Sequence, residues 1–294
     1  FTGFGSPHAR LENNRISFAP VAATIARPLS TTHTFKRHFS SQRPIPKKVA
    51  HRYMKQIKET RYWKDALQII DDVEKAGFVP NLFLYNAAIN KCAFKGRWRE
   101  AMRLYERMIQ NGIDPDAFTF STLINTCGRG GRTDVALALW DELQERQVKP
   151  NEFVYASLIS ACEKGGAKYT GTALKFYADM SNSGLKPNLI ALSAAISACE
   201  KGGRRYTDAA LDLLDAMGDI GLEPDVIVYS AAISSCEKGG PKYTQRALSL
   251  LVEMKSKRIK PNVFAYSSAI SACEKGGGEY YTGKALYLYE EMKG

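Results

Sequence analysis

Apolar residues recur at helical spacing in paired short segments along most of the chain. Within 82–116, the apolar side chains from Tyr85 to Cys92 repeat every three to four residues, which is the spacing of one helical face. Gly96 interrupts this pattern, and a second apolar face follows until Gly112. Each unit of this kind therefore predicts two helices joined by a short turn, which together make a helical hairpin.

Cysteine fixes the register of the repeat. The chain contains six cysteines, each about ten residues into a unit and spaced 35, 35, 37, 37 and 37 residues apart: Cys92, Cys127, Cys162, Cys199, Cys236 and Cys273. The units are 82–116, 117–151, 152–188, 189–225, 226–262 and an incomplete 263–294. A period of this length is typical of a solenoid. Because the sequence has no Cys-x-x-Cys and each Cys lies in an apolar stripe, we expect buried thiols rather than disulfides or metal ligands.

Two regions depart from the plain 35-residue unit. The segment 47–81 fits only the second half of the pattern and is predicted to be a degenerate capping repeat. From 152 onward, two or three residues are inserted after Gly-Gly, and each insertion ends in Tyr-Thr. We expect the threonine to cap the second helix and the tyrosine to pack on a leucine of its first turn; the threonines are Thr170, Thr207, Thr244 and Thr282. Base stacking by these tyrosines is the alternative.

Composition narrows the class of protein. The 294 residues are 45% hydrophobic, which is enough to fill a core and excludes a wholly disordered chain. No apolar run approaches the roughly 18 residues of a membrane-spanning helix, and we expect no membrane partner. The formal net charge of +11 points to an anionic partner, for which nucleic acid is the first candidate.

The first 46 residues differ from the repeats. They carry six Lys or Arg and one acidic residue, and they are rich in Ser and Thr. The run Arg37-His-Phe-Ser-Ser resembles a mitochondrial processing site. We therefore predict that 1–46 is a disordered organelle transit peptide, mitochondrial with plastid import as the rival. A plain basic tail is the alternative.

Catalytic chemistry has little support in the sequence. All four histidines lie within the first 51 residues, so the six repeats of 82–294 have none for acid–base or metal chemistry. No Gly-rich phosphate loop or deaminase-type His-x-Glu element occurs. We expect no enzyme activity, no cofactor or metal, and no small-molecule substrate. Because residue 1 is Phe and the last unit stops before its terminal Gly and Pro, we expect further sequence at both ends.

The repeat resembles the pentatricopeptide repeat family over 47–294. The resemblance rests on runs such as Asn81-Leu-Phe-Leu-Tyr-Asn and Gly112-Ile-Asp-Pro-Asp, which recur in register through six units. It implies an all-α fold, a right-handed superhelical solenoid of antiparallel helix-turn-helix repeats. It also implies that the first helices line a concave groove that holds single-stranded RNA, about one base per repeat.

In that family the fifth and last residues of a unit read the base edge together. The resemblance gives the pairs Asn86 with Asp116, Ser121 with Asn151, Ala156 with Asn188, Ser193 with Asp225, and Ser230 with Asn262, while Ser267 lacks a partner. Short amides, hydroxyls and carboxylates have the donors and acceptors for this task. The alternative for the last residue is a helix N-cap, because Asp or Asn directly precedes each first helix.

Two further sets of residues are candidates for RNA contact. The second residue of each unit shares a helical face with the fifth and is a candidate base-stacking platform, with inter-repeat core as the alternative: Phe83, Phe118, Phe153, Ile190, Ile227 and Phe264. A cation recurs two residues after each of five cysteines and is a candidate phosphate contact: Arg129, Lys164, Lys201, Lys238 and Lys275. Attraction to the helix dipole is the alternative for these cations.

The sequence thus predicts a sequence-specific single-stranded RNA-binding protein that acts on organellar transcripts in stability, processing, editing or translation. Other organellar RNA-processing proteins are candidate partners. Two alternatives stay open: a scaffold that binds a protein partner in its groove, and the guide part of a longer RNA-processing enzyme.

Overall fold

The computed structural model describes residues 43–293, which form fourteen α-helices, short 3-10 helices and two very short strands. The predicted transit peptide, 1–46, lies almost entirely outside the described residues. Within them, no helix is both long and apolar enough to cross a membrane.

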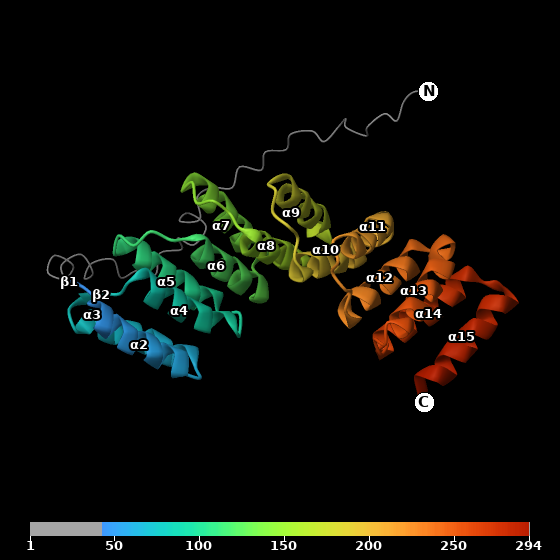
Figure 1. The fold of residues 1–294 in the computed structure, drawn as a ribbon, viewed down its shortest axis with the longest axis horizontal. Coiled ribbons are helices and arrows are strands. Elements are labelled where there is room, and N and C mark those ends of the chain that lie inside the picture. Colours follow the sequence, from blue (N-terminus) through green and yellow to red (C-terminus); the bar gives the residue numbers. More distant parts are fainter. Residues whose placement is uncertain (1–42, 294) are drawn as a thin grey trace, which may run out of the picture.

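Each unit folds into the predicted helical hairpin. The first helices are α2 (Lys47–Glu59), α4 (Leu82–Ala93), α6 (Ala117–Arg129), α8 (Glu152–Gly165), α10 (Leu189–Gly202), α12 (Val226–Gly239) and α14 (Val263–Gly276). The second helices are α3 (Trp63–Lys75), α5 (Trp98–Gln110), α7 (Thr133–Glu145), α9 (Thr170–Asn182), α11 (Thr207–Asp219), α13 (Thr244–Ser256) and α15 (Gly278–Lys293). The hairpins follow one another along the long axis of the molecule (Figure 1).

The segment before α2 belongs to the folded array. Strand β1 (Arg43–Pro44) pairs in parallel with β2 (Phe78–Val79), and the Arg43 amide donates to the Gly77 carbonyl at 3.0 Å. The ordered array therefore begins a few residues before Lys47, where the sequence analysis had placed its start.

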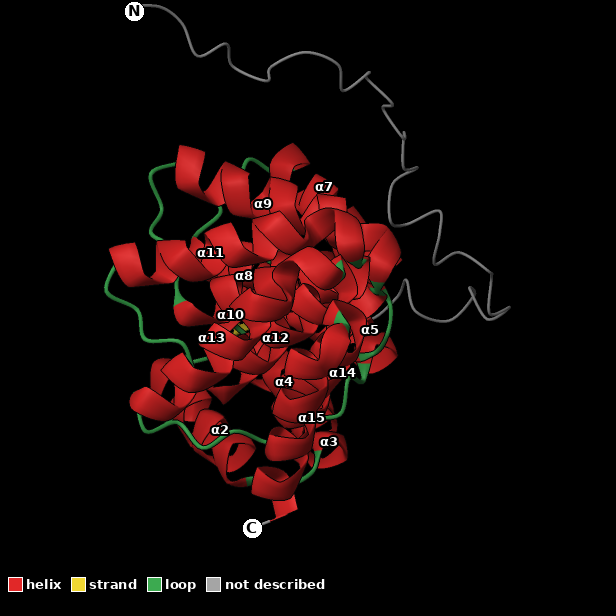
Figure 2. Cartoon of the chain, turned by 90° about the vertical axis from the view of Figure 1, so that its right-hand side faces the viewer, coloured by secondary structure: helices red, strands yellow, loops and turns green. Residues whose placement is uncertain are grey.

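Stacking of the first helices determines the curvature. Each first helix from α4 to α12 packs on the first helix of the next unit, and each second helix packs on the first helices on either side of it. Successive second helices lie farther apart and meet through long side chains, as where Arg107 of α5 pairs with Asp71 and Glu74 of α3. Viewed along the long axis (Figure 2), α8, α10 and α12 lie toward the centre and α5, α7 and α9 toward the periphery. The first helices therefore line the concave side, and the molecule is a helical-repeat solenoid.

A continuous apolar core runs between successive first helices. All six cysteines lie in it, each buried and unpaired, as the sequence predicted. Burial raises the pKa of the thiols of Cys92, Cys127, Cys162, Cys199 and Cys236 to about 12. These residues act as small apolar side chains that allow close helix approach.

The insertions after Gly-Gly form 3-10 turns: η2 (Ala167–Tyr169), η3 (Arg204–Tyr206) and η4 (Pro241–Tyr243). The expectation that their threonines cap the second helices is wrong. The Thr170 hydroxyl instead donates to the Ala198 carbonyl of the next unit at 2.9 Å, and Thr207 and Thr244 make the same bond to Ser235 and Ala272. These threonines are the first residue of the helix, where the side chain points to the neighbouring repeat. In the last unit Thr282 lies inside α15 and donates to the Gly278 carbonyl.

Candidate nucleic-acid interface

A row of exposed apolar side chains runs along the first helices. The second residue of each unit is more than half exposed, from 51% at Phe118 to 69% at Phe83; the row comprises Phe83, Phe118, Phe153, Ile190, Ile227 and Phe264. These side chains are therefore surface groups and not inter-repeat core. Six apolar side chains at one repeat position thus form an exposed apolar row along the first helices.

The last residue of every unit is a helix N-cap. Its Oδ1 atom accepts a hydrogen bond from a backbone amide in the first turn of the next first helix, at 2.8 to 3.1 Å. The residues are Asn81, Asp116, Asn151, Asn188, Asp225 and Asn262. The capping role that the sequence analysis weighed against base reading is therefore present at every junction.

Capping occupies only one of the two polar side-chain atoms. Within the described residues, Asp225 Oδ2 has no hydrogen-bond partner, and neither has the Nδ2 atom of Asn151 or Asn188. Because Oδ1 is fixed by the helix amides, an Asn cap leaves a donor free and an Asp cap leaves an acceptor free. The cap thus orients the side chain and leaves it one specific hydrogen-bonding function.

The fifth residues of the units are more buried than expected for side chains that contact a base edge. Asn86, Ser121 and Ser230 are buried, and their polar atoms already have partners in the protein. Ser121 donates to the Phe118 carbonyl at 2.9 Å, and Ser230 donates to the Val226 carbonyl at 2.6 Å. Ala156 is buried as well, while Ser193 is half-buried and Ser267 is exposed. Where it is buried, the fifth position therefore forms the floor of the groove.

Two of the predicted pairs make direct contact. Asn86 Nδ2 donates to Asp116 Oδ1 at 3.3 Å, and Ser230 Oγ donates to Asn262 Oδ1 at 3.1 Å. Thr119, which completes the capping box at Asp116, also donates to Asn86 Oδ1 at 2.7 Å. The other three pairs share no hydrogen bond. The two contacts show that the fifth and last positions meet across the junction between units.

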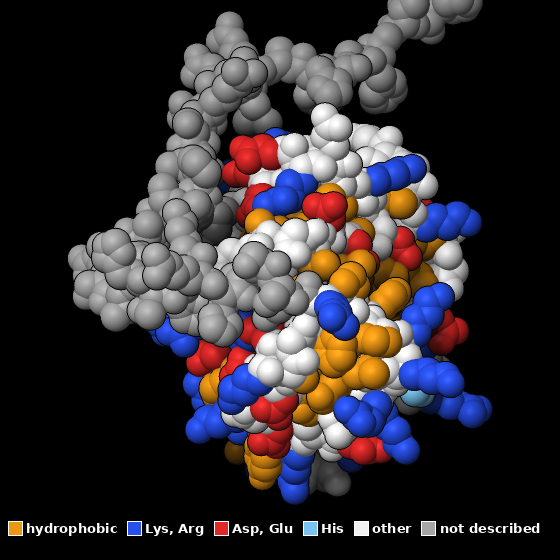
Figure 3. Space-filling model, turned by 90° about the vertical axis from the view of Figure 1, so that its left-hand side faces the viewer, with side chains coloured by type: hydrophobic (Ala, Val, Ile, Leu, Met, Phe, Trp, Pro, Cys, Tyr) orange, Lys and Arg blue, Asp and Glu red, His pale blue; other side chains and the backbone are white. Residues whose placement is uncertain are grey.

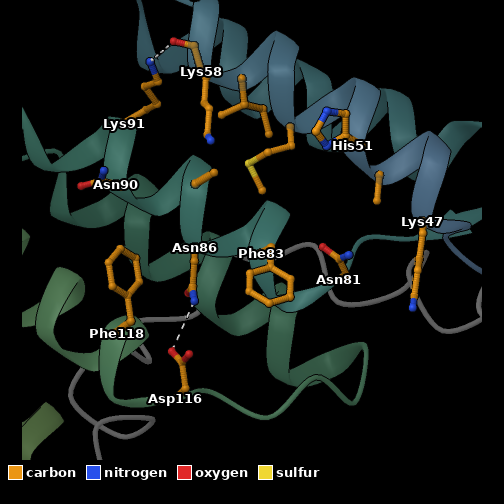
Figure 4. A pocket seen from close by; sticks show the side chains of 14 residues that line it. Lys47, His51, Lys58, Asn81, Phe83, Asn86, Asn90, Lys91, Asp116 and Phe118 are labelled. Atoms are coloured by element: carbon orange, nitrogen blue, oxygen red, sulfur yellow. Dashed lines mark hydrogen bonds between the residues drawn. The ribbon is translucent and has the colours of Figure 1, made fainter. Parts of the chain in front are cut away.

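A cavity lies at the N-terminal end of this groove. It has a volume of about 980 Å³ and lies between α2 and the helices α4 and α6. In Figure 4, Phe83 and Phe118 lie on either side of the Asn86–Asp116 pair. Figure 3 looks onto this end of the molecule, where apolar side chains gather and Lys and Arg surround them. Two exposed aromatic rings, a polar pair and surrounding cations are thus brought together at this end of the groove.

The wall that α2 contributes was missed in the sequence analysis. Lys47, His51, Met54 and Lys58 of α2 line the cavity opposite Phe83. The signal was the register itself, because His51 and Asn81 are the fifth and last residues of 47–81. The poor apolar pattern of this helix had led to its prediction as part of a degenerate capping repeat.

The recurring lysines form a ladder across the repeats. The Lys201 ammonium lies 2.5 Å from Glu163 Oε1 of the preceding unit and 3.1 Å from its carbonyl oxygen. Lys238 with Glu200 and Lys275 with Glu237 make the same two contacts. Three of the five candidate phosphate contacts are thus already paired with a carboxylate.

The other two cations have no such partner. Gly128 and Ala93 occupy the positions where a glutamate would pair with Lys164 and Arg129. No carboxylate of the described residues forms an ion pair with either cation. Burial lowers the pKa of Lys164, the neighbouring Glu163 carboxylate opposes this shift, and the charges of Arg129 and Lys201 add to it. Positive charge is therefore concentrated at the ends of α6 and α8.

Among curated proteins, no sequence matches this chain at a significant level. Three models of repeat families match the chain: the PPR repeat family over 80–129, the PPR repeat over 118–148, and the pentatricopeptide repeat domain over 135–204 and 207–275.

Solved structures share the fold at low identity. The pentatricopeptide repeat protein PPR10 from maize is 22% identical, with a TM-score of 0.54 over 93% of this chain and 42% of that one. The PPR domain of Arabidopsis thaliana protein-only RNase P 1, in complex with tRNA, is 16% identical, with a TM-score of 0.50 over 61% of this chain and 90% of that domain. The chain covers about two fifths of the length of the PPR10 chains that it matches.

The repeat matches extend over more than half of the chain, and they share the register of the helical hairpins in the structure. The chain therefore belongs to the pentatricopeptide repeat family.

Proposed function

We propose that this protein binds single-stranded RNA in its concave groove and reads about one base per repeat. Bases stack on the exposed second residues, while the free atom of each capping Asn or Asp contacts the base edge. Unpaired cations at the ends of α6 and α8 attract the phosphates. PPR10 and protein-only RNase P 1, both of which share the fold, have been crystallised with RNA.

The observation that carries this proposal is the divided use of the capping side chain. At Asp225, Oδ1 accepts from the amides of Ile227 and Val228 at 2.9 Å, and Oδ2 is left free. A free carboxylate oxygen accepts from guanine N1–H or uracil N3–H, and it repels adenine N1, which is itself an acceptor. At Asn188 the free Nδ2 donates to adenine N1 or cytosine N3.

The floor residue then separates large from small bases. Ser at the fifth position leaves room for a purine, whereas the longer Asn86 fills that space and favours a pyrimidine. Asn86 with Asp116 therefore suits uracil, Ser with Asn suits adenine, and Ser193 with Asp225 suits guanine. Ala156 contributes no polar group and should discriminate poorly. With the chain parallel to the RNA, 82–262 prefers 5′-U-A-N-G-A-3′.

We propose that the protein acts in an organelle, the mitochondrion in preference to the plastid. Support comes from the composition of 1–46, which carries six basic residues, one acidic residue and a run that resembles a processing site. The repeats would guide or protect a transcript without catalysing a reaction themselves. Within 43–293, no group of three His, Cys, Asp or Glu side chains could hold a metal ion.

Selection of bound RNA from a random pool tests the proposal. The expected result is enrichment of the five-base pattern, with binding that weakens steeply as salt increases and is competed by single-stranded RNA. A pool that shows no enrichment, together with competition by peptides rather than RNA, would favour a protein-binding scaffold instead.

A further inference from the structure

A second basic site lies outside the groove, where two of the inserted 3-10 turns meet. A cavity of about 400 Å³ opens between η3 and η4 and is lined by Arg204, Arg205, Asp208, Lys242 and Tyr243. The three cations come from two successive units and are all exposed. The insertions, which lengthen these units from 35 to 37 residues, are what create the site.

The charges at this cavity are not balanced within the protein. Arg204, Arg205 and Lys242 form no ion pair with any carboxylate of the described residues. The single acid, Asp208, accepts a hydrogen bond from the Tyr243 hydroxyl at 2.5 Å. Three cations face one carboxylate that is already engaged, which leaves an excess of positive charge. The ladder lysine Lys238, by contrast, is paired with Glu200.

Two of the three cations are held over aromatic rings. The Arg205 guanidinium lies 4.6 Å from the centre of the Tyr206 ring, and the Lys242 ammonium lies 4.4 Å from that of Tyr243. Tyr243 is itself buried, so the ring is a fixed support. Stacking restricts the motion of these long side chains and lowers the entropy lost when they bind an anion.

The preceding pair of 3-10 turns, η2 and η3, lacks the same set of residues. One repeat earlier, the positions of Arg204 and Asp208 are occupied by Ala167 and Gly171, and only Lys168 and Arg205 supply charge. The cluster of Arg204, Arg205, Asp208 and Lys242 is therefore not repeated at the preceding junction. It is also close to the groove, because Arg204 follows the ladder residue Lys201 by three positions at the end of α10.

We propose that the cavity between η3 and η4 binds a backbone phosphate of RNA that flanks the segment held in the groove. This inference rests on the proposed function and adds a second contact surface to it. A guanidinium can donate two parallel hydrogen bonds to phosphate oxygens, and an ammonium supplies a compact positive charge beside it. A strand that leaves the groove over the ends of α10 and α12 meets these groups first.

Binding of two RNAs tests the proposal. The first is the five-nucleotide target, and the second is the same target with ten uridines added at each end. Each is titrated against the wild type and Arg204→Ala/Lys242→Ala at several salt concentrations. The matched control, Lys186→Ala/Lys260→Ala, removes two exposed cations from the loops at the opposite ends of the helices.

For the flanked RNA, we expect the slope of log affinity against log salt to become shallower by about 0.7 in the Arg204/Lys242 variant, since one phosphate contact is lost. The control and the five-nucleotide RNA should show no such change. Equal changes in both variants, no change in either, or an equal fall with the short RNA would overturn the proposal.

The test also separates this inference from the proposed function. Failure of the short RNA to bind would contradict recognition in the groove. The flanked RNA would then still show whether the cavity between η3 and η4 binds a phosphate. A wild type that binds neither RNA overturns both.

Discussion

The Lys201 ammonium lies 2.5 Å from the Glu163 carboxylate, 38 positions earlier in the chain. Both groups lie at the ends of neighbouring first helices, and two further units repeat the pairing. The recurring Glu-Lys motif is therefore an inter-repeat contact as well as a row of cations. The five candidate phosphate contacts fall into two classes, the free pair Arg129 and Lys164 and the three paired lysines.

This division predicts unequal salt effects on RNA binding. Lys164→Ala should reduce the slope of log affinity against log salt by about 0.7, because an unpaired ammonium is lost. Removing the whole ion pair in Lys201→Ala/Glu163→Ala should leave the slope nearly unchanged, since the net charge is the same. Fluorescence anisotropy titrations from low to moderate salt measure both. Equal reductions would mean that Lys201 leaves Glu163 to contact phosphate.

The threonine contacts between units predict a stability loss. Thr170→Val keeps the side-chain shape but removes the hydrogen bond to the Ala198 carbonyl, so the free energy of unfolding should fall by about 0.5 to 1.5 kcal/mol. Thr282→Val is the control, because its bond is within an exposed part of α15, and the change should stay within about 0.5 kcal/mol. Urea unfolding compares the two. Similar losses in both variants would argue against the inter-repeat role.

A glycine at the end of α10 should be intolerant of a side chain. A Cβ atom on Gly202 would lie 2.4 Å from Tyr206 Cδ2 and 2.7 Å from Thr170 Oγ1. Gly202→Ala should therefore destabilise the protein by about 1 to 3 kcal/mol. Gly218→Ala meets no atom within 4 Å inside α11 and should be neutral or stabilise by up to about 1 kcal/mol. Thermal melts of both variants measure the effect. A melting temperature of Gly202→Ala at or above that of the wild type would contradict the prediction.

The buried thiols predict slow chemistry in the folded state. With the pKa raised to about 12 at five of the six cysteines, the thiolate is scarce, and labelling of the native protein at pH 8 should be far slower than in urea. Unfolded thiols ionise near pH 9, so these groups reduce stability as the pH rises from 9 toward 12. Rapid modification of most thiols without denaturant would show that the core opens.

Local patterns predicted the hairpins well, because helical periodicity and an Asx residue before a helix depend on near neighbours. Asn188 was a candidate for both capping and reading; the structure shows the cap through Oδ1, and reading through Nδ2 stays a prediction. Contacts between units were harder to predict. The Thr170 bond to Ala198 and the Lys201 pair with Glu163 depend on the stacking of hairpins, which a single repeat does not encode. The α2 wall of the N-terminal cavity was missed because the poor apolar pattern of this helix led to its interpretation as a degenerate capping repeat.

The central claim is that the cap's free atom selects the base, and Asp225→Asn tests it most directly. Oδ1 still caps α12, while the free atom changes from an acceptor to a donor. Binding to RNAs that vary only at the fourth base should change preference from guanine to adenine by about 1 to 3 kcal/mol, with the other positions unchanged. A uniform loss of affinity across all four RNAs would contradict the account and leave Asp225 as a helix cap alone.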